Sequence, residues 1–281
     1  MFELNNKVVL VTGATRGIGK GIAIALAKKG AIVYFTGRTE KEYQGAVQLS
    51  GSLQATEDEI KKVGGLGYGI RCDHEDDKQT KIVLDRIISE QGKIDILVNN
   101  VWGGYEHFSD GTEFWKETGF WTMPISRFDK SINAGIRAHY VTSLYTVPHM
   151  IRQNSGLIFN ISFWAAERND MGVTYGIAKS ASKKMTETMA YELKEYGIGV
   201  ITIYPGLVRT ESVMKSADFL DLSNSESTEF VGLAIAALAS DDNVMEKSGS
   251  KQIAAQVAID YGYKDIDGTQ PIPLNTSNCK Q

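Results

Sequence analysis

The chain has 281 residues, of which 42% are hydrophobic and 23% are charged, as is ordinary for a globular protein. Its formal net charge of -4 provides no attraction to nucleic acid or anionic lipid, so we expect no nucleic-acid partner. No apolar run could span a membrane or form the core of a signal peptide, so we expect a cytoplasmic protein without a transmembrane segment. The two cysteines, Cys72 and Cys279, do not suggest a disulfide framework and are interpreted as free thiols.

Short apolar runs alternate along the chain with segments long enough to form helices. The runs, which resemble strands buried on both faces of a parallel sheet, are Val8–Val11, Ile32–Phe35, Ile94–Val98, Leu157–Ile161 and Val200–Tyr204. Such βαβ units have right-handed crossovers, which place helices on both sides of the sheet. We therefore predict an α/β protein with a single-domain Rossmann fold over residues 1–281, a doubly wound parallel β-sheet of about seven strands flanked by helices on both faces, and a C-terminal tail at about 256–281.

Helical signals follow the first two predicted strands. Between Gly17 and Gly30 an apolar residue recurs every four positions, which predicts a helix that lays one face on the sheet and ends at Gly30. Thr39 followed by Glu42 matches a capping box, so we expect the next helix to begin there, with Glu40 in its first turn.

A glycine-rich turn, Thr12-Gly13-Ala14-Thr15-Arg16-Gly17-Ile18-Gly19, lies between the first strand and its helix. Glycines allow a tight turn and a close approach of the backbone to a pyrophosphate, and the helix N-terminus offers free N–H groups and a positive dipole end. This context favours a dinucleotide-binding turn over the alternative, a glycine-rich turn without a ligand.

The residue that distinguishes the two nicotinamide dinucleotides is expected about 20 positions beyond the glycines. Thr36-Gly37-Arg38 occupies that place, and a guanidinium binds a 2′-phosphate that a carboxylate would repel. Arg38 therefore favours NADP(H), and Arg16 is either a second cation for the phosphate or a solvated surface residue. Glu40 is explained more simply by its helical position than as a carboxylate selective for NAD.

Tyr175 and Lys179 are spaced i, i+4 in a predicted helix, which puts the phenol and the ammonium on one face. A phenol with its usual pKa of about 10 is a poor acid-base catalyst at neutral pH, and a nearby cation favours the phenolate. Lys179 is placed to supply that charge. Ser162, at the end of a predicted strand, lies thirteen residues before Tyr175.

These motifs occur in an order that resembles the short-chain dehydrogenase/reductase family. The resemblance runs from about residue 5 to about residue 255 and rests on Thr12-Gly13-xxx-Gly17-x-Gly19, Asp73, Asn99-Asn100, Asn133, Ser162, Tyr175-xxx-Lys179 and Pro205-Gly206. It implies an oxidoreductase in which hydride passes between NADP(H) and a carbonyl or hydroxyl group.

The resemblance implies four catalytic roles. Tyr175 would be the general acid or base, and Lys179 would lower its pKa and bind the nicotinamide ribose. Ser162 would position the reacting oxygen, and Asn133 would hold a water that links Lys179 to solvent. The family often has two small or hydroxyl residues where this chain has Ser162-Phe163, so Phe163 is the alternative occupant of the serine position.

The resemblance also implies contacts with the cofactor. Asp73 would bond the adenine edge, or else cap a helix, and Asn99 and Asn100 would brace the neighbouring strand, or else be turn residues. The residues expected to bind the cofactor, together with Tyr175 and Lys179, are Gly13, Thr15, Arg16, Gly17, Ile18, Gly19, Arg38, Asp73, Asn99, Pro205, Gly206, Val208 and Thr210.

Residues 101–130 fit neither a helical nor a strand period, so we expect a long loop with some short helix over the active site. The aromatic side chains of this loop favour a small hydrophobic or aromatic carbonyl substrate. The same side chains would also suit a small structural core within the loop or a subunit interface. The rings are those of Trp102, Tyr105, Phe108, Phe114, Trp115, Phe120, Trp121 and Phe128. Val101-Trp102 replaces the alanine and glycine usual in the family, which predicts a bulkier wall beside the cofactor.

Three further expectations concern metals, assembly and rival functions. The histidines lack metal-ligand spacing, so no catalytic metal is expected. If the chain did hold a metal, His107 with Glu106 and Asp110 would be the first candidate for its ligands. The family resemblance implies a homodimer or homotetramer formed through long helices that begin near Ile125 and Thr174. A non-catalytic NADPH-binding regulator and a scaffold protein remain alternatives, because a fold does not fix a function.

Overall fold

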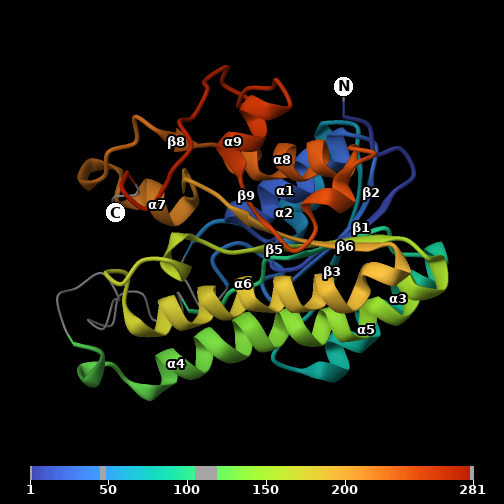
Figure 1. Cartoon of the computed structure of the whole chain (residues 1–281), viewed down its shortest axis with the longest axis horizontal. Coiled ribbons are helices and arrows are strands. Elements are labelled where there is room, and N and C mark those ends of the chain that lie inside the picture. Colours follow the sequence, from blue (N-terminus) through green and yellow to red (C-terminus); the bar gives the residue numbers. More distant parts are fainter. Residues whose placement is uncertain (1, 45–48, 105–118, 279–281) are drawn as a thin grey trace.

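A parallel sheet of seven strands crosses the centre of the molecule (Figure 1). The computed structural model describes residues 2–44, 49–104 and 119–278. The strand order is β3-β2-β1-β4-β5-β6-β9, and the order reverses between β1 and β4, the switch point at which such sheets bind ligands. The strands are β1 (Val8–Val11), β2 (Ile32–Gly37), β3 (Leu66–Arg71), β4 (Ile96–Asn99), β5 (Gly156–Ile161), β6 (Ile198–Tyr204) and β9 (Lys251–Ile253).

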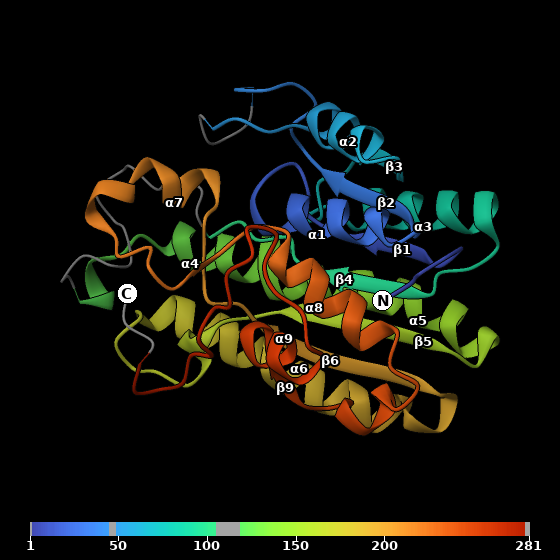
Figure 2. The same ribbon diagram turned by 90° about the horizontal axis from the view of Figure 1, so that it is seen from above.

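Helices cover both faces of this sheet, which confirms the predicted doubly wound Rossmann fold (Figures 1 and 2). One layer consists of α1 (Gly17–Lys28), α2 (Leu53–Lys62), α8 (Phe230–Ala239) and α9 (Ala254–Asp260). The other layer consists of α3 (Asp77–Gln91), α5 (Ala138–Gln153) and α6 (Val173–Leu193). Two apolar cores, one under each layer, bury β1, β4 and β6 at every residue.

Shorter elements gather at the carboxyl end of the strands. Figure 2 shows α4 (Ile125–Ser131) and α7 (Glu211–Lys215) at the same end of the sheet. A separate pair of short parallel strands, β7 (Leu207–Val208) and β8 (Ser225–Glu226), flanks α7 in the sequence. Together these elements surround the switch point between β1 and β4.

The helix after β2 begins later than the sequence predicts. α2 begins at Leu53, and its N-cap is Ser52, so the prediction of a capping box at Thr39 and Glu42 is wrong. Glu42 instead accepts a hydrogen bond from the N–H of Gly51 at 3.2 Å. This bond joins the described residues 38–44, which follow β2, to the described residues 49–52, which precede α2.

Two long helical runs begin where they are predicted. α4 starts at Ile125 and continues through a π-helix, Ile132–Arg137, into α5, while α6 starts at Val173. Within the described ranges, every helix is too short or too polar to cross a membrane. Cys72 is a buried free thiol. Residues 105–118, which include the rings of four predicted loop aromatics and the His107 group, lie outside the described residues, as does Cys279.

Candidate active site

Tyr175 and Lys179 stand one turn apart on α6, and both side chains face the interior. Each residue is only 8% exposed, and the Lys179 Nζ lies 5.5 Å from the centroid of the Tyr175 ring. Burial lowers the pKa of Lys179 to about 8, so the amine is largely protonated at neutral pH. The predicted pairing of a phenol with a positive amine is therefore present in the structure.

The segment after β4 connects this pair to the glycine-rich turn. A Cβ atom added to Gly13 would lie 2.7 Å from the Val101 Cα, so the two backbones touch. The next residue, Trp102, lies with its ring centroid 4.3 Å from the Lys179 Nζ and 5.6 Å from the Tyr175 ring. The turn and the Tyr175–Lys179 pair thus share one continuous wall, formed by Val101 and Trp102.

Ser162 and Phe163 follow β5 beside the same helix. The Ser162 hydroxyl is 1% exposed and donates to the backbone carbonyl oxygen of Lys179 at 3.0 Å. Since a hydroxyl has a single proton, Ser162 cannot also donate to a substrate oxygen in this arrangement. The Phe163 ring, by contrast, lies 6.4 Å from the Tyr175 ring. The alternative reading, with Phe163 at the usual serine position, fits these contacts.

The glycine-rich turn has the geometry that its residues require. Gly13 and Gly17 have positive φ angles of 70° and 58°, which side-chain-bearing residues rarely adopt. A Cβ at Gly19 would lie 2.2 Å from the Gly13 carbonyl oxygen. The Asn100 side chain donates to the carbonyl oxygens of Thr12 and Gly13 at 3.0 and 2.9 Å and holds the turn closed. The turn thereby sets the position of the N–H groups at the start of α1, where helices bind anions.

A carboxylate of the chain itself lies at the start of α1. The N–H of Gly17 donates to Glu211 Oε2 at 2.8 Å, so an anionic group lies where helix N-termini bind phosphate. Glu211 is the first residue of α7, and Thr210 before it caps that helix. A Cβ at Gly17 would lie 3.4 Å from the Thr210 Cγ2, which brings the predicted Thr210 to the turn.

Two arginines lie at the end of β2. Arg38 Nη1 is 3.8 Å from Asp73 Oδ2 and 4.0 Å from Glu75 Oε1. Arg16 Nη2 donates to the Gly51 carbonyl oxygen at 3.0 Å, and its Nε is buried without a hydrogen-bond partner among the described residues. Burial, together with the charge of Arg38, lowers the pKa of Arg16. The structure therefore brings the two predicted cations near each other.

The carboxylates of Asp73 and Glu40 differ in part from what the sequence predicts. Asp73 Oδ1 accepts a hydrogen bond from the Glu75 N–H at 3.1 Å, whereas Asp76 is the N-cap of α3. Glu40 is exposed in the irregular segment after β2, 3.7 Å from the Nε of Arg71, so its predicted place in a helix is wrong.

The other predicted site residues either support the site from within the protein or line it. Asn99 is buried and donates to Ser143 Oγ and Asn160 Oδ1 at 3.0 and 2.9 Å, which joins β4, β5 and α5. It therefore supports the wall from within the protein, while Asn100 makes the contact with the turn. Asn133 lies in the π-helix, an element frequent at functional sites, which packs against α6.

The segment after β6 completes the site. Pro205 and Gly206 follow β6, and a Cβ at Gly206 would lie 2.8 Å from the buried Glu226 Oε1. Val208 pairs with Glu226 across β7 and β8. Burial raises the pKa of Glu226 to about 8, a feature that the sequence does not reveal because it depends on packing between distant residues. Thr15 and Ile18 lie within the turn and at the start of α1.

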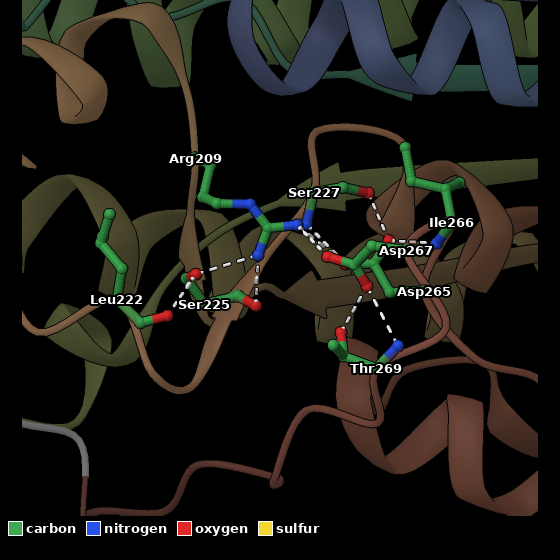
Figure 3. A network of polar contacts seen from close by, with 8 residues as sticks. All are labelled: Arg209, Leu222, Ser225, Ser227, Asp265, Ile266, Asp267 and Thr269. Carbon is green, nitrogen blue, oxygen red and sulfur yellow. Dashed lines mark hydrogen bonds and ion pairs between the residues drawn. The ribbon is translucent and has the colours of Figure 1, made fainter.

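A network of hydrogen bonds and ion pairs joins this segment to Asp265 and Asp267, which follow α9 (Figure 3). Arg209 donates to the Ser225 carbonyl oxygen at 2.9 Å and to Asp267 Oδ2 at 2.7 Å. Asp265, also within 4 Å of Arg209, accepts hydrogen bonds from the N–H and hydroxyl of Ser227. The C-terminal residues therefore hold the base of the segment that contains Thr210 and Glu211.

This arrangement coincides with a match to a protein family. Residues 7–221 match the family described as short chain dehydrogenase. The chain belongs to the short-chain dehydrogenase family. Members bind a nicotinamide dinucleotide. The glycine turn, the start of α1, where Glu211 already places an anionic group, and the Arg16 Nε, which has no hydrogen-bond partner among the described residues, fit such a group.

Several relatives of this short-chain dehydrogenase are named as dehydrogenases or reductases. The chain is 35% identical to dehydrogenase/reductase SDR family member 1 from Mus musculus, over 94% of this chain and 85% of that protein. It is 31% identical to 7alpha-hydroxysteroid dehydrogenase from Escherichia coli (strain K12), over 75% and 74% of the two chains. A solved 7 alpha-hydroxysteroid dehydrogenase, complexed with NADH and 7-oxo glycochenodeoxycholic acid, is 26% identical with a TM-score of 0.72, covering 90% of this chain and 94% of that one.

Glu211 is a site residue that the sequence does not single out, because its contact joins residues 194 positions apart. Its carboxylate uses an N–H group that a dinucleotide phosphate would need, so the Glu211→Gln variant should bind the cofactor about threefold to tenfold more tightly. Fluorescence titration of the purified protein with NADPH measures this change. Asp218→Asn, which removes an exposed charge from the same segment, should leave the Kd unchanged. An equal or weaker affinity in Glu211→Gln would contradict the expectation.

Proposed function

We propose that this short-chain dehydrogenase transfers hydride between NADP(H) and a carbonyl or hydroxyl group of a small, hydrophobic substrate. The observation that carries the proposal is the buried Tyr175–Lys179 pair, joined to the glycine-rich turn through Val101 and Trp102. A dinucleotide on the turn would extend along this wall toward the pair. The bound nicotinamide supplies or accepts the hydride, and the protein supplies the proton.

Tyr175 is the proton donor in the direction of carbonyl reduction. Its hydroxyl gives a proton to the carbonyl oxygen as negative charge develops there, and the phenolate that remains is favoured by the positive charge of Lys179. In the direction of alcohol oxidation, the phenolate takes the proton back. The short distance between the Lys179 Nζ and the Tyr175 ring makes this electrostatic effect strong in a buried site.

The remaining catalytic assignments are those that the family resemblance implies, with one change for Ser162. Lys179 binds the nicotinamide ribose, and Asn133, on the π-helix that packs against α6, holds a water that connects Lys179 with solvent. We assign Ser162 a supporting role, because its proton is engaged by the Lys179 carbonyl oxygen. Positioning of the substrate oxygen by Ser162 would require its hydroxyl to leave that carbonyl.

The surroundings of Tyr175 support an apolar substrate. Trp102 and Phe163 lie beside the Tyr175 ring, and Trp164 is buried in the same cluster. Relatives of this chain are named as 7alpha-hydroxysteroid dehydrogenases, which agrees with this proposal. Two other aromatics of the predicted loop, Phe120 and Trp121, are 63% and 78% exposed and meet each other edge to face, so they do not support the prediction of a substrate pocket.

Replacement of Tyr175 tests the proposed chemistry. Tyr175→Phe should lower kcat for carbonyl reduction about 100-fold to 10,000-fold, because the ring remains but its proton is lost. The assay follows NADPH consumption with a panel of aromatic and alicyclic ketones. Tyr191→Phe, on an 85% exposed residue of the same helix, is the matched control and should act like the wild type. Ser162→Ala should lose less activity than Tyr175→Phe. Equal rates for the wild type and Tyr175→Phe would show that this site does not catalyse the reaction.

The preference for NADP(H) rests on Arg38 and Arg16. Both guanidinium groups lie near the end of β2, where a 2′-phosphate would be bound, and Arg16 retains a buried donor without a partner among the residues described. The family as a whole does not fix this choice, since one structural relative was solved with NADH.

Arg38→Asp should shift the preference toward NADH, because the carboxylate repels a 2′-phosphate and accepts hydrogen bonds from ribose hydroxyls. The ratio of kcat/KM for NADPH to that for NADH should fall at least about tenfold. Arg71→Leu removes an exposed arginine from the neighbouring strand and should leave the ratio unchanged. An unaltered ratio in Arg38→Asp would overturn the assignment of NADP(H).

We infer that the protein assembles as a homo-oligomer through α5 and α6. Tyr140 and Leu144 form an exposed apolar stripe on α5, and Val173, Ile177 and Tyr191 form another on α6. Figure 1 shows the two helices side by side on one face of the sheet. Exposed apolar area of this kind marks subunit contacts.

Leu144→Glu should therefore convert a dimer or tetramer into a monomer, because it places a charge in the apolar contact. Light scattering coupled to size-exclusion chromatography measures the mass. Ile82→Glu, at a 64% exposed position on α3, should leave the mass unchanged. A wild-type protein that is already monomeric would refute the inference.

A further inference from the structure

We propose that Trp102 is a positioning residue for Lys179, and that its indole face holds the ammonium group in place and stabilises its charge. This inference rests on the proposed function, in which the charge of Lys179 favours the Tyr175 phenolate. Trp102 follows Val101 in the segment after β4, which forms the wall between the glycine-rich turn and Lys179.

The three side chains form a compact arrangement. The Lys179 Nζ is 4.3 Å from the centroid of the Trp102 ring and 5.5 Å from that of Tyr175. The Trp102 and Tyr175 rings meet edge to face, with centroids 5.6 Å apart and an interplanar angle of 71°. Attraction between a cation and an aromatic face extends to about 6 Å and is strongest for tryptophan.

The surroundings fix the indole in this orientation. A Cβ at Gly104 would lie 2.5 Å from the ring, and one at Gly135 in the π-helix would lie 2.8 Å from it, so only glycine leaves room at both positions. His139 on α5 bonds the carbonyl oxygen of Val101 through Nε2 at 2.9 Å, which holds the backbone directly before Trp102. The ring is therefore positioned by three elements of the fold.

Among the residues that the structure describes, no hydrogen bond or ion pair of the Lys179 ammonium accompanies its contacts with the two rings. Burial is the cause of the lowered pKa of Lys179. Within the described part of the chain, the titratable groups that face it from the packed elements are Tyr175 on α6 and His139 on α5. Burial and the charge of Lys179 lower the pKa of His139 to about 3, so this ring is neutral and contributes no charge of its own. The indole face is thus a main partner of a buried cation.

The direction of the expected effect follows from this arrangement. An aromatic face favours the protonated amine, so its removal should lower the pKa of Lys179 further. The size of a buried cation–π contact corresponds to a decrease of about half to one and a half pH units. Above the new pKa the amine would be neutral, and the Tyr175 phenolate would lose its stabilising charge.

The test is a pH titration of Lys179 by nuclear magnetic resonance in full-length protein carrying lysine labelled with ¹³C at Cε and ¹⁵N at Nζ. The Lys179 signal is assigned as the one missing from Lys179→Met. In Trp102→Leu this signal should titrate about half to one and a half pH units lower than in the wild type. An unchanged or higher midpoint would overturn the proposal.

Two variants separate the indole face from packing and folding. Trp164→Leu removes an indole from the same aromatic cluster, one that lies 4.6 Å from the Lys251 Nζ, and should not move the Lys179 midpoint. An equal shift in Trp164→Leu would assign the effect to packing and refute the proposal. Trp102→Phe keeps a weaker aromatic face, so its midpoint should fall by less, which preserves the test if Trp102→Leu does not fold.

The titration uses neither cofactor nor substrate, so it is independent of the proposed reaction. Where a ketone from the panel is reduced, the alkaline limb of the kcat profile in Trp102→Leu should move to lower pH by the same amount. A loss of packing alone would lower the rate at all pH values without moving this limb, which would contradict the proposal. Absence of turnover by the wild type with every ketone would refute the proposed function and leave the titration result standing.

Discussion

The central constraint on this site is the burial of a positive charge. Lys179 is only 8% exposed, and taking an ammonium from water into a protein interior is unfavourable unless other groups compensate. Here the compensation comes from aromatic faces, because Trp102 and Tyr175 both lie within 6 Å of the Nζ. The amine therefore acts on Tyr175 through a medium of low polarity, in which its charge has a large effect on a neighbouring phenol.

The same wall couples the proton-transfer pair to the glycine-rich turn. Asn100 closes that turn, Val101 touches its first glycine, and Trp102 packs on Lys179, so three consecutive residues contact both halves of the site. They follow β4, directly across the switch point from β1. A parallel sheet brings the ends of these strands together, and this is why residues far apart in sequence form one site.

The sequence predicts those features that depend on neighbouring residues. Continuous apolar runs identify the buried central strands, and local spacing identifies the glycine turn and the Tyr175–Lys179 pair. β3 is not among the apolar runs, because its sequence, Leu-Gly-Tyr-Gly-Ile-Arg, contains two glycines. The capping box at Thr39 fails because Glu42 forms a bond across the loop to Gly51 instead. The contacts of Glu211, His139 and Glu226 depend on packing between distant segments, which no local pattern encodes.

The segment from β7 through α7 is held by the hydrogen bonds of Arg209 at one end and by one hydrogen bond of Glu211, which a bound cofactor would replace, at the other. Arg209 ties the base to Ser225 and to Asp267 near the C-terminus through hydrogen bonds that engage both ends of the guanidinium (Figure 3). Two residues later, Glu211 makes a single bond to the N–H of Gly17, the group that an incoming phosphate would use. Cofactor binding must displace this one bond and can leave the Arg209 network intact. The opening therefore costs little, while Gly206 and Val208 keep their places beside Glu226.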